Sequence, residues 1–396
     1  MRRILAVPEE QNDTMASPKL AKYRFYLRQR PALLVALSIL AVVFFLAVTG
    51  LSRAYYRQRE FLGDRWSARG YADLKANNYD AAVTDFRTAL LYSRDDYFYQ
   101  LNLAEALIGL SRTGEASAYL LNLWDREPEN GVVNLELARI ARQQGRTDQA
   151  IRYYHGAVYA AWQRGEESQR REARFELVDL LLQNKDQGDA EAELIALAAN
   201  ANDDPALQKR IGDLFMRAGD YEHALAAYRT ALRTNQHDEK AMAGAGNAAF
   251  QLQRYLLAQH YLKSAGVADS TDLHSAQLLQ TTESVLRMDP FRPQISSADR
   301  SKIVMDAFSA AGHRLSSCPL PKNVTAGSVG SPPSLSDEWN TLKPRINPLG
   351  LRRNPDLADS AMDLVFRIEH QTSLVCGTPT GTDLALLLIA KLHEGS

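Results

Sequence analysis

The sequence contains few cysteines and no excess of charge of either sign. Cys318 and Cys376 are the only cysteines among 396 residues, too few for a disulfide-dense mini-domain or for a four-thiolate zinc site. The formal net charge is −1, which argues against a dedicated nucleic-acid-binding protein because phosphate binding requires a cationic field. The composition is otherwise that of an ordinary folded chain with room for several domains or one extended array.

Motifs of the common catalytic sites are also missing. The eight histidines are scattered, with no HExxH and no HxH pair, so no metal site is predicted. Neither GxSxG nor a Walker loop occurs. The stretch 244–249, GAGNAA, formally matches a dinucleotide-binding pattern, but no strand precedes it. We therefore expect no enzyme activity, no catalytic residues and no cofactor.

One long apolar run lies near the N-terminus. From Ala32 to Thr49 the chain reads ALLVALSILAVVFFLAVT, with twelve Leu, Ile, Val and Phe residues and no charge. These residues contribute about −4 to −7 kcal/mol of insertion free energy. Extended to Leu51, the run forms about 30 Å of helix, which matches the hydrocarbon core of a bilayer. The sequence predicts a transmembrane helix over 32–51.

The apolar run has two other interpretations. A buried core helix is disfavoured because no face of the run is polar and arginines flank it. A cleaved signal peptide stays open, but the run is longer than the usual 7–15 apolar residues, so an uncleaved anchor is favoured.

Charge near the run gives a small orientation bias. Basic residues precede it and also follow it, and the latter are partly offset by Glu60 and Asp64. The bias favours a cytoplasmic basic lead over 1–31 and an extracytoplasmic, periplasmic C-terminal domain. Residues 52–62 are interpreted as a linker.

Two stretches 142 residues apart have closely similar sequences: 78–90 reads NYDAAVTDFRTAL and 220–232 reads DYEHALAAYRTAL. This similarity belongs to a 34-residue repeat that starts at residue 63, with six extra residues at 165–170. Such a period predicts stacked helical hairpins, because no unit buries its apolar face alone. The six units are 63–96, 97–130, 131–164, 171–204, 205–238 and 239–272.

Three positions of the unit carry the pattern. The twentieth is always alanine: Ala82, Ala116, Ala150, Ala190, Ala224 and Ala258. The eighth is nearly always small: Gly70, Ala104, Ala138, Val178, Gly212 and Gly246. The twenty-fourth is always large: Phe86, Leu120, Tyr154, Leu194, Tyr228 and Leu262. Small residues let two antiparallel helices approach closely, and large ones fill the space beside the next unit.

This pattern resembles the tetratricopeptide repeat (TPR) family, in particular membrane-anchored bacterial TPR proteins. The fifth unit, IGDLFMRAGDYEHALAAYRTAL, has Gly212, Tyr221, Ala224, Tyr228 and Ala231 at the family's signature positions. The resemblance implies an all-α fold: one transmembrane helix, a right-handed superhelix of about six helix-turn-helix units, and a small helical C-terminal module.

Beyond the repeats we expect two capping helices within 273–315. One covers 273–287 with Asp272 as N-cap, and the other covers 297–311 and ends at Gly312. Residues 316–396 are interpreted as a Pro/Gly-rich loop followed by C-terminal helices. The expected elements are a short helix at 337–342, then helices at 356–372 and 383–393 that pack on the last repeats.

The resemblance also implies a groove for a partner. In the family, positions five, nine, twelve and thirteen of the first helix of each unit face the concave side. Apolar and charged groups alternate there, which suits an extended peptide or a partner helix. The corresponding residues are Tyr71, Leu74, Lys75, Leu101, Glu105, Ile108, Leu135, Arg139, Arg142, Phe175, Asp179, Leu182, Lys209, Asp213, Met216, Arg217, Asn247 and Phe250.

Two details qualify the chemistry. The family's clamp for acidic tails pairs a lysine with an asparagine on one helix, whereas Lys209 is followed by Asp213, so that clamp is not expected. Cys318 and Cys376 either form a disulfide that closes a long loop or remain free thiols in a reducing compartment.

The favoured function is a membrane-tethered scaffold for protein–protein interaction in envelope assembly or secretion, with a protein partner in the groove, the membrane as second contact and no nucleic acid. One alternative is an enzyme whose C-terminal module uses His313, Asp337, His370 and Cys376. Another is a periplasmic helper that handles heme or metal.

Overall fold

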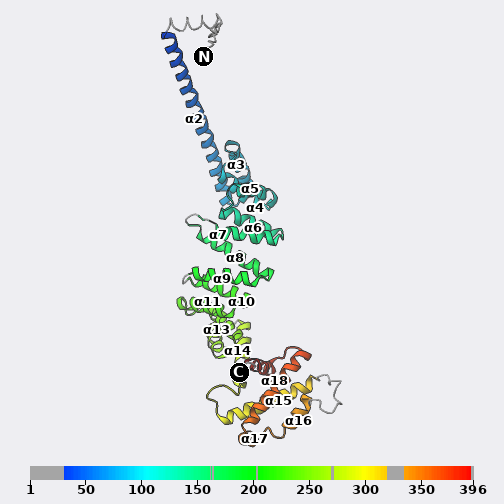
Figure 1. The fold of residues 1–396 in the computed structure, drawn as a ribbon. Coiled ribbons are helices and arrows are strands. Elements are labelled where there is room, and N and C mark those ends of the chain that lie inside the picture. Colours follow the sequence, from blue (N-terminus) through cyan, green and yellow to red (C-terminus); the bar gives the residue numbers. More distant parts are fainter. Residues whose placement is uncertain are drawn as a thin grey trace, which may run out of the picture. The chain divides into compact units, whose positions relative to one another are not determined.

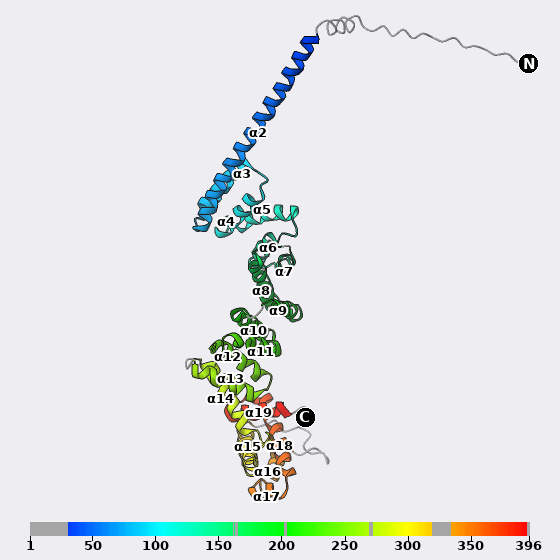
Figure 2. The ribbon, with the colours of Figure 1, turned by 90° about the vertical axis from the view of Figure 1, so that its left-hand side faces the viewer.

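The computed structural model describes residues 31–160, 162, 165–201, 204–268, 272–318 and 334–393, and these contain helices and no strand (Figures 1 and 2). The predicted basic lead up to residue 30 and the central part of the predicted Pro/Gly-rich loop lie outside the described residues. The chain divides into two compact units, Met1–Ala161 and Trp162–Ser396. The division falls beside the predicted six-residue insertion at 165–170.

The first unit begins with one helix of 45 residues, α2 (Pro31–Lys75) (Figure 1). It contains the apolar run, the segment predicted as a linker and the first helix of the first repeat. The segment 52–62 is helical because it contains neither glycine nor proline and consists mostly of good helix formers. The helix is long and apolar enough to cross a membrane, and the side chains of its apolar run are exposed.

The remaining helices of the repeats keep the predicted register. In all six units the second helix begins at position seventeen, and in four the first begins at position one. In the first compact unit of the chain, the helices after α2 are α3 (Tyr79–Tyr92), α4 (Tyr97–Gly109), α5 (Thr113–Arg126), α6 (Gly131–Gln143) and α7 (Thr147–Tyr159). In the second they are α8 (Glu167–Asn184), α9 (Gln187–Asn200), α10 (Pro205–Ala218), α11 (Tyr221–Thr234), α12 (Glu239–Gln251) and α13 (Tyr255–Ala268).

The turn inside each hairpin has a shared backbone conformation. Position fifteen has a positive φ in every unit, between 59° and 80°. Only Gly145 and Gly219 are glycines there, so the sequence alone revealed two of the six turns. The other residues at this position are Asn77, Ser111, Lys185 and Gln253. This left-handed residue ends the first helix and lets the chain reverse.

Entry into the next unit is controlled by side-chain caps. Asp96, Asn130, Asp204 and Asp238 each precede a first helix and accept a backbone N–H from its first turn. Such a cap contributes about 1 kcal/mol. The longer α8 lacks this cap and begins four residues before its unit, because part of the insertion joins the helix.

Packing between paired helices follows the small and large positions. All six position-twenty alanines are fully buried. Each glycine at position eight lies against the position-twenty-four side chain of its own unit. A Cβ added at Gly212 would lie 2.8 Å from the Tyr228 ring, and one at Gly246 would lie 2.7 Å from Leu262. The close approach therefore depends on the missing side chain.

The C-terminal module consists of α14 (Leu273–Met288), α15 (Ser297–Ser317), α16 (Leu335–Leu342), α17 (Pro348–Arg353), α18 (Asp356–Cys376) and α19 (Gly381–His393). Helix α15 packs on α18, and α19 lies against α14 and α18. One hydrophobic cluster joins Val304, Met362, Val365 and Ile389 with Tyr255 of the last repeat. The module thus covers the end of the repeat array, which would otherwise expose its apolar face.

Two features of the module differ from the sequence prediction: the end of α15 and an additional short helix. Helix α15 does not end at Gly312 but continues to Ser317. Gly312 is a packing glycine, because an added Cβ would meet the Trp339 indole, which also donates to Phe308 O at 3.1 Å. Helix α17 lies in chain predicted as irregular, and it begins at a proline capped by Asn347.

Cys318 and Cys376 form a disulfide with a Cα–Cα distance of 6.2 Å. It links the end of α15 to the end of α18 across 58 residues of sequence. A crosslink that closes a loop of this length stabilises a fold by about 4 kcal/mol in the chain-entropy model.

Two glycines give a matched test of the close packing. We expect Gly212→Ala to lower the free energy of unfolding by about 1–3 kcal/mol, since its Cβ would press on the buried Tyr228 ring. Gly266→Ala should raise it by about 0.5–1 kcal/mol, since this helical glycine has no heavy atom within 4 Å of its added Cβ. Urea denaturation followed by circular dichroism checks both. Equal effects would show that helix propensity, and not contact with the ring, decides the outcome.

Candidate functional site

A cavity of about 410 Å³ lies in the second unit, on the side of the repeats that the TPR resemblance assigns to the groove. Five helices, α10 to α14, contribute to its walls. It is lined by Asp213, Met216, Arg217, Tyr228, Glu239, Lys240, Ala243, Gly244, Asn247, Ala265, Asp272, His274, Ser275 and Leu278.

Tyr228 links the cavity to the packing of the repeats. Its ring lies between Gly212 and Gly244, and a Cβ added at either glycine would fall within 2.8 Å of it. Its hydroxyl donates to Asp213 Oδ1 at 2.6 Å. Burial and this carboxylate raise the pKa of Tyr228 well above its ordinary value, so the hydroxyl stays a proton donor and fixes the Asp213 side chain.

Charges of both signs surround this ring. Arg217 pairs with Asp179 at 2.8 Å, and Glu239 and Lys240 come from the start of α12. Asp272 caps α14, and the hydroxyl and N–H of Ser275 lower its pKa. The cavity therefore offers cationic and anionic groups beside apolar carbon, which is a surface for a peptide and not for a single-sign polymer.

Asn247 supplies an unsatisfied polar group. Its side-chain oxygen is buried and has no hydrogen-bond partner among the residues that the structure describes. A buried acceptor without a donor costs about 1–3 kcal/mol. An N–H group placed in the cavity by a ligand would remove that cost, so Asn247 is the residue of this site most suited to recognise a backbone.

Some residues predicted for the groove line this cavity, and others have different contacts. Asp213, Met216, Arg217 and Asn247 lie on its walls. Other groups lie outside the lining: Lys209 pairs with Asp238 at 2.7 Å, Asp179 pairs with Arg217, Leu182 packs on the core of the unit, and Phe250 packs on the C-terminal module.

Three residues predicted for the groove surface are buried instead. Leu74, Leu135 and Phe175 are at most 6% exposed. Positions five and twelve share a helix side with the small position eight, so apolar residues there are drawn against the neighbouring helices. Phe175 is also covered by the Arg210 guanidinium, 3.7 Å from the ring centroid.

The residues predicted for the groove in the first compact unit of the chain have separate surroundings. Tyr71 is exposed, with the Lys75 ammonium 5.1 Å from its ring centroid. Glu105 is exposed, whereas Leu101 and Ile108 are half-buried against the core. Arg139 pairs with Glu136 at 2.7 Å, and Arg142 is half-buried.

Sequence reasoning missed ten of the fourteen residues that line the cavity. Ala243 occupies position five of the sixth unit but is not among the residues predicted for the groove. His274, Ser275 and Leu278 belong to the capping helix, outside the repeat. The signal available for them was the Asp272 cap, which indicates that α14 begins beside the last unit.

An α-helical repeat protein whose groove positions line a cavity is thus the class that the fold and site define. A profile of the tetratricopeptide repeat family matches residues 67–131, 135–205 and 209–271, which make up half of the chain. The chain belongs to the tetratricopeptide repeat family, and the predicted family and all-α fold are confirmed. The family supports a role as a protein-interaction scaffold.

Several solved structures are similar to this chain at low identity. YrrB, "a TPR protein with an unusual peptide-binding site", is 14% identical; the match covers 48% of this chain and 95% of that chain, with a TM-score of 0.40. PilF of Pseudomonas aeruginosa is 17% identical, with coverages of 55% and 97% and a TM-score of 0.41. The type IV pilus biogenesis factor PilW is 15% identical, with coverages of 56% and 98% and a TM-score of 0.39. No curated protein matches the chain significantly.

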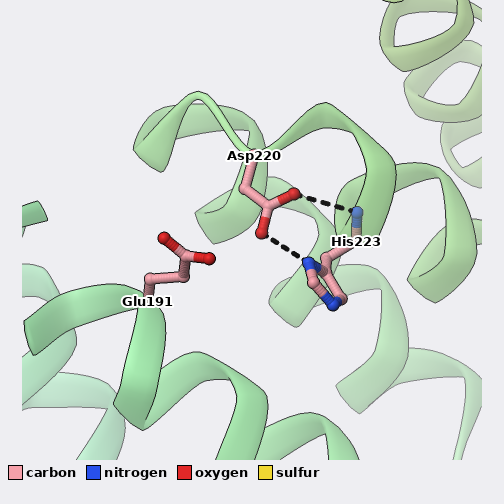
Figure 3. A group of neighbouring side chains, drawn as sticks. All are labelled: Glu191, Asp220 and His223. Atoms are coloured by element: carbon pink, nitrogen blue, oxygen red, sulfur yellow. Dashed lines mark hydrogen bonds and ion pairs between the residues drawn. The ribbon is translucent and has the colours of Figure 1, made fainter. Parts of the chain in front are cut away.

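Among the described residues, one group of side chains has the spacing of a metal site: Glu191, Asp220 and His223 (Figure 3). Asp220 and His223 belong to the start of α11, and Glu191 faces them from α9. Asp220 already caps α11 through the His223 N–H and bonds the His223 ring. Glu191 and His223 are exposed. Capping explains the Asp220–His223 pair without an ion.

The residues considered for an enzyme in the C-terminal module have separate structural settings. Asp337 bonds Ser334 at the start of α16, and Cys376 is held in the disulfide, so it offers no thiol. His313 and His370 are exposed on α15 and α18.

Glu369 of α18 is the unusual group of this module. It is fully buried, and within the described part of the chain neither carboxyl oxygen has a hydrogen-bond partner. Burial, followed by the nearby Asp383 charge, raises its pKa from 4.5 to about 8, although Arg314 acts in the opposite direction. The carboxyl group is therefore largely protonated at neutral pH.

This burial makes the stability of the module pH-dependent. The folded pKa lies above the unfolded one, so stability is full below about pH 4.5 and falls as pH rises towards 8. The loss by pH 8.5 should be about 3–5 kcal/mol. Urea denaturation, followed by the fluorine signal of 5-fluorotryptophan at Trp339, should show this decline.

Glu369→Gln should abolish most of that pH dependence, since the amide does not titrate. Asp359→Asn, an exposed acid of the same helix, should leave it in place. A wild-type module equally stable at pH 5.5 and 8.5 would contradict the buried, protonated state of Glu369.

Proposed function

We propose that this protein is a membrane-tethered scaffold that holds a segment of a partner protein in its repeat groove, in envelope assembly or secretion. It performs no chemistry of its own in this proposal. The observation that carries it is the cavity between α10 and α14, where groove positions of two repeats converge on the unpartnered oxygen of Asn247.

The cavity walls supply the contacts that a bound segment needs. Asn247 receives a backbone N–H of the partner, while Met216, the Tyr228 ring and Leu278 cover an apolar side chain. Lys240 and Asp272, both on the cavity walls, orient charged groups. Each contact is weak, and several together provide useful affinity.

The apolar part of α2 supports the tether. One helix in a bilayer confines the repeats to a thin layer, so a partner in the same membrane meets the groove at a high effective concentration. A modest intrinsic affinity then suffices for binding.

The disulfide supports the compartment. Disulfides persist in oxidising compartments and are rare in the reducing cytosol. A bond between Cys318 and Cys376 therefore favours an extracytoplasmic location for the C-terminal domain, with the basic lead in the cytoplasm.

Site-specific photo-crosslinking in native membranes tests the groove. A photoreactive amino acid at Ala243, on the cavity wall, should crosslink a partner, and one at Ala226, exposed on α11 outside the lining, should not. Asn247→Ala should reduce the yield at Ala243 by about fivefold, the effect of losing one hydrogen bond of about 1 kcal/mol. Gln251→Ala, on the exposed end of the same helix, is the control. Equal yields at both positions would place the partner elsewhere.

A further inference from the structure

The part of α2 beyond the apolar run has no break and carries an unusual set of side chains. Residues 52–61 read SRAYYRQREF within the single helix Pro31–Lys75. At 1.5 Å per residue, Arg53 lies about 3 Å and Arg57 about 9 Å beyond Leu51. The headgroup layer on each side of a bilayer is about 5–8 Å thick. Arg53 therefore lies within that layer and Arg57 at its outer edge if the apolar run fills the hydrocarbon core.

One side of this segment holds the first repeat. The Arg59 guanidinium donates to Leu91 O at 3.2 Å and to Tyr92 O at 2.7 Å, the last carbonyls of α3. This contact caps the C-terminal end of α3, where a cation is favoured by the helix dipole. A Cβ added at Gly63 would lie 3.5 Å from Tyr92 Cβ, so this end of α3 lies at the level of residue 63, about 18 Å beyond Leu51.

The opposite side is exposed and cationic. Arg57 is rotated by about 200° from Arg59 on the helix, so it points away from α3. Arg53 lies one turn earlier on the same side as Arg57. Both are exposed, and neither has a hydrogen bond or ion pair with the residues that the structure describes.

Aromatic and apolar side chains surround these arginines. Tyr55, Tyr56 and Phe61 are 57%, 64% and 66% exposed. Tyr residues are enriched at membrane–water interfaces because one end of the ring is apolar and the other polar. Leu91, at the end of α3, is 78% exposed. A large exposed apolar residue beside Arg59 suits a lipid surface better than open water.

Acidic groups also lie near this part of α2. Glu60 follows on α2, and the α3–α4 turn contains Arg94, Asp95 and Asp96. Asp96 is committed to capping α4. Arg53 and Arg57 lie between this turn and the apolar run, so the side chains nearest to the bilayer are the cationic ones.

We infer that residues 52–61 of α2 form a membrane-surface collar in which Arg53 and Arg57 bind lipid headgroup phosphates, with Leu91 of α3 just beyond it. This inference rests on the proposed membrane tether. Arginine is suited to phosphate because its planar guanidinium donates two parallel hydrogen bonds. The first repeat is then held rigidly against the bilayer and does not hang on a flexible stalk.

The collar restricts the partner. Tyr71 lies twenty residues beyond Leu51 on the same helix, about 30 Å from the hydrocarbon core. A segment that contacts this end of the repeats must reach that height, so the expected partner exposes its binding segment close to the membrane on the same side.

Spin labels on the full-length chain in lipid nanodiscs test the collar. The native cysteines are paired in the disulfide, so Leu91→Cys and Ala76→Cys each give one reactive thiol. Ala76, the matched position, is exposed and lies at the far end of the same hairpin, about 37 Å beyond Leu51. Nickel-chelating lipids, whose metal sits at the headgroups, should strongly relax the label at 91 and leave the label at 76 near background.

A charge-removal pair tests the phosphate contact. Arg53→Gln/Arg57→Gln should lower the nickel-dependent relaxation at position 91 at least twofold. Arg65→Gln/Lys75→Gln, which removes equal charge farther along the same helix, should leave it unchanged. An unchanged signal in the first variant would overturn the role of the arginines.

The outcomes separate this inference from the tether. A chain that alkaline carbonate extracts from native membranes is not anchored, which overturns the proposed tether itself. A chain that resists extraction but shows equally weak relaxation at positions 91 and 76 is anchored without a collar, which overturns the inference alone.

Discussion

The contact between the Tyr228 ring and two glycines is the interaction on which the structure depends most. Gly212 belongs to the same hairpin and Gly244 to the next, so one ring closes a helix pair and joins it to its neighbour. The Tyr228 hydroxyl then fixes Asp213, and the ring itself lines the cavity. Tyr228 therefore contributes both to the packing of the repeats and to the cavity wall. A change that loosens the hairpin also alters the surface offered to a partner.

Much of the fold could be predicted because the repeat places its signals at fixed positions. The alanine at position twenty and the helix start at position seventeen recur without exception. What failed depended on neighbours distant in sequence. Gly312 looked like a helix end, whereas it accommodates Trp339 from another helix. Leu74, Leu135 and Phe175 matched groove positions by number, but burial is decided by what packs against a residue, which the unit register does not contain.

The first and last repeats are each joined to another part of the chain. At one end α2 serves both as the apolar helix and as the first helix of the first repeat, so no joint separates the two. At the other end α14 and the module behind it cover the last hairpin, and a disulfide and the buried Glu369 lie in that module. A buried acid is a group whose cost rises with pH. In the second unit, α14 thus both covers the last hairpin and contributes a wall of the cavity.

A double-mutant cycle of Gly212→Ala and Tyr228→Ala measures the central contact most directly. A Cβ added at Gly212 would lie 2.8 Å from the Tyr228 ring, and alanine at position 228 removes the atoms that this Cβ would meet. If the ring on the glycine holds the hairpin, Gly212→Ala should cost clearly less in the Tyr228→Ala background, with a coupling free energy of about 1 kcal/mol or more in urea denaturation. Additive effects of the two substitutions would contradict the account, because they would show that the ring and the glycine stabilise the fold independently.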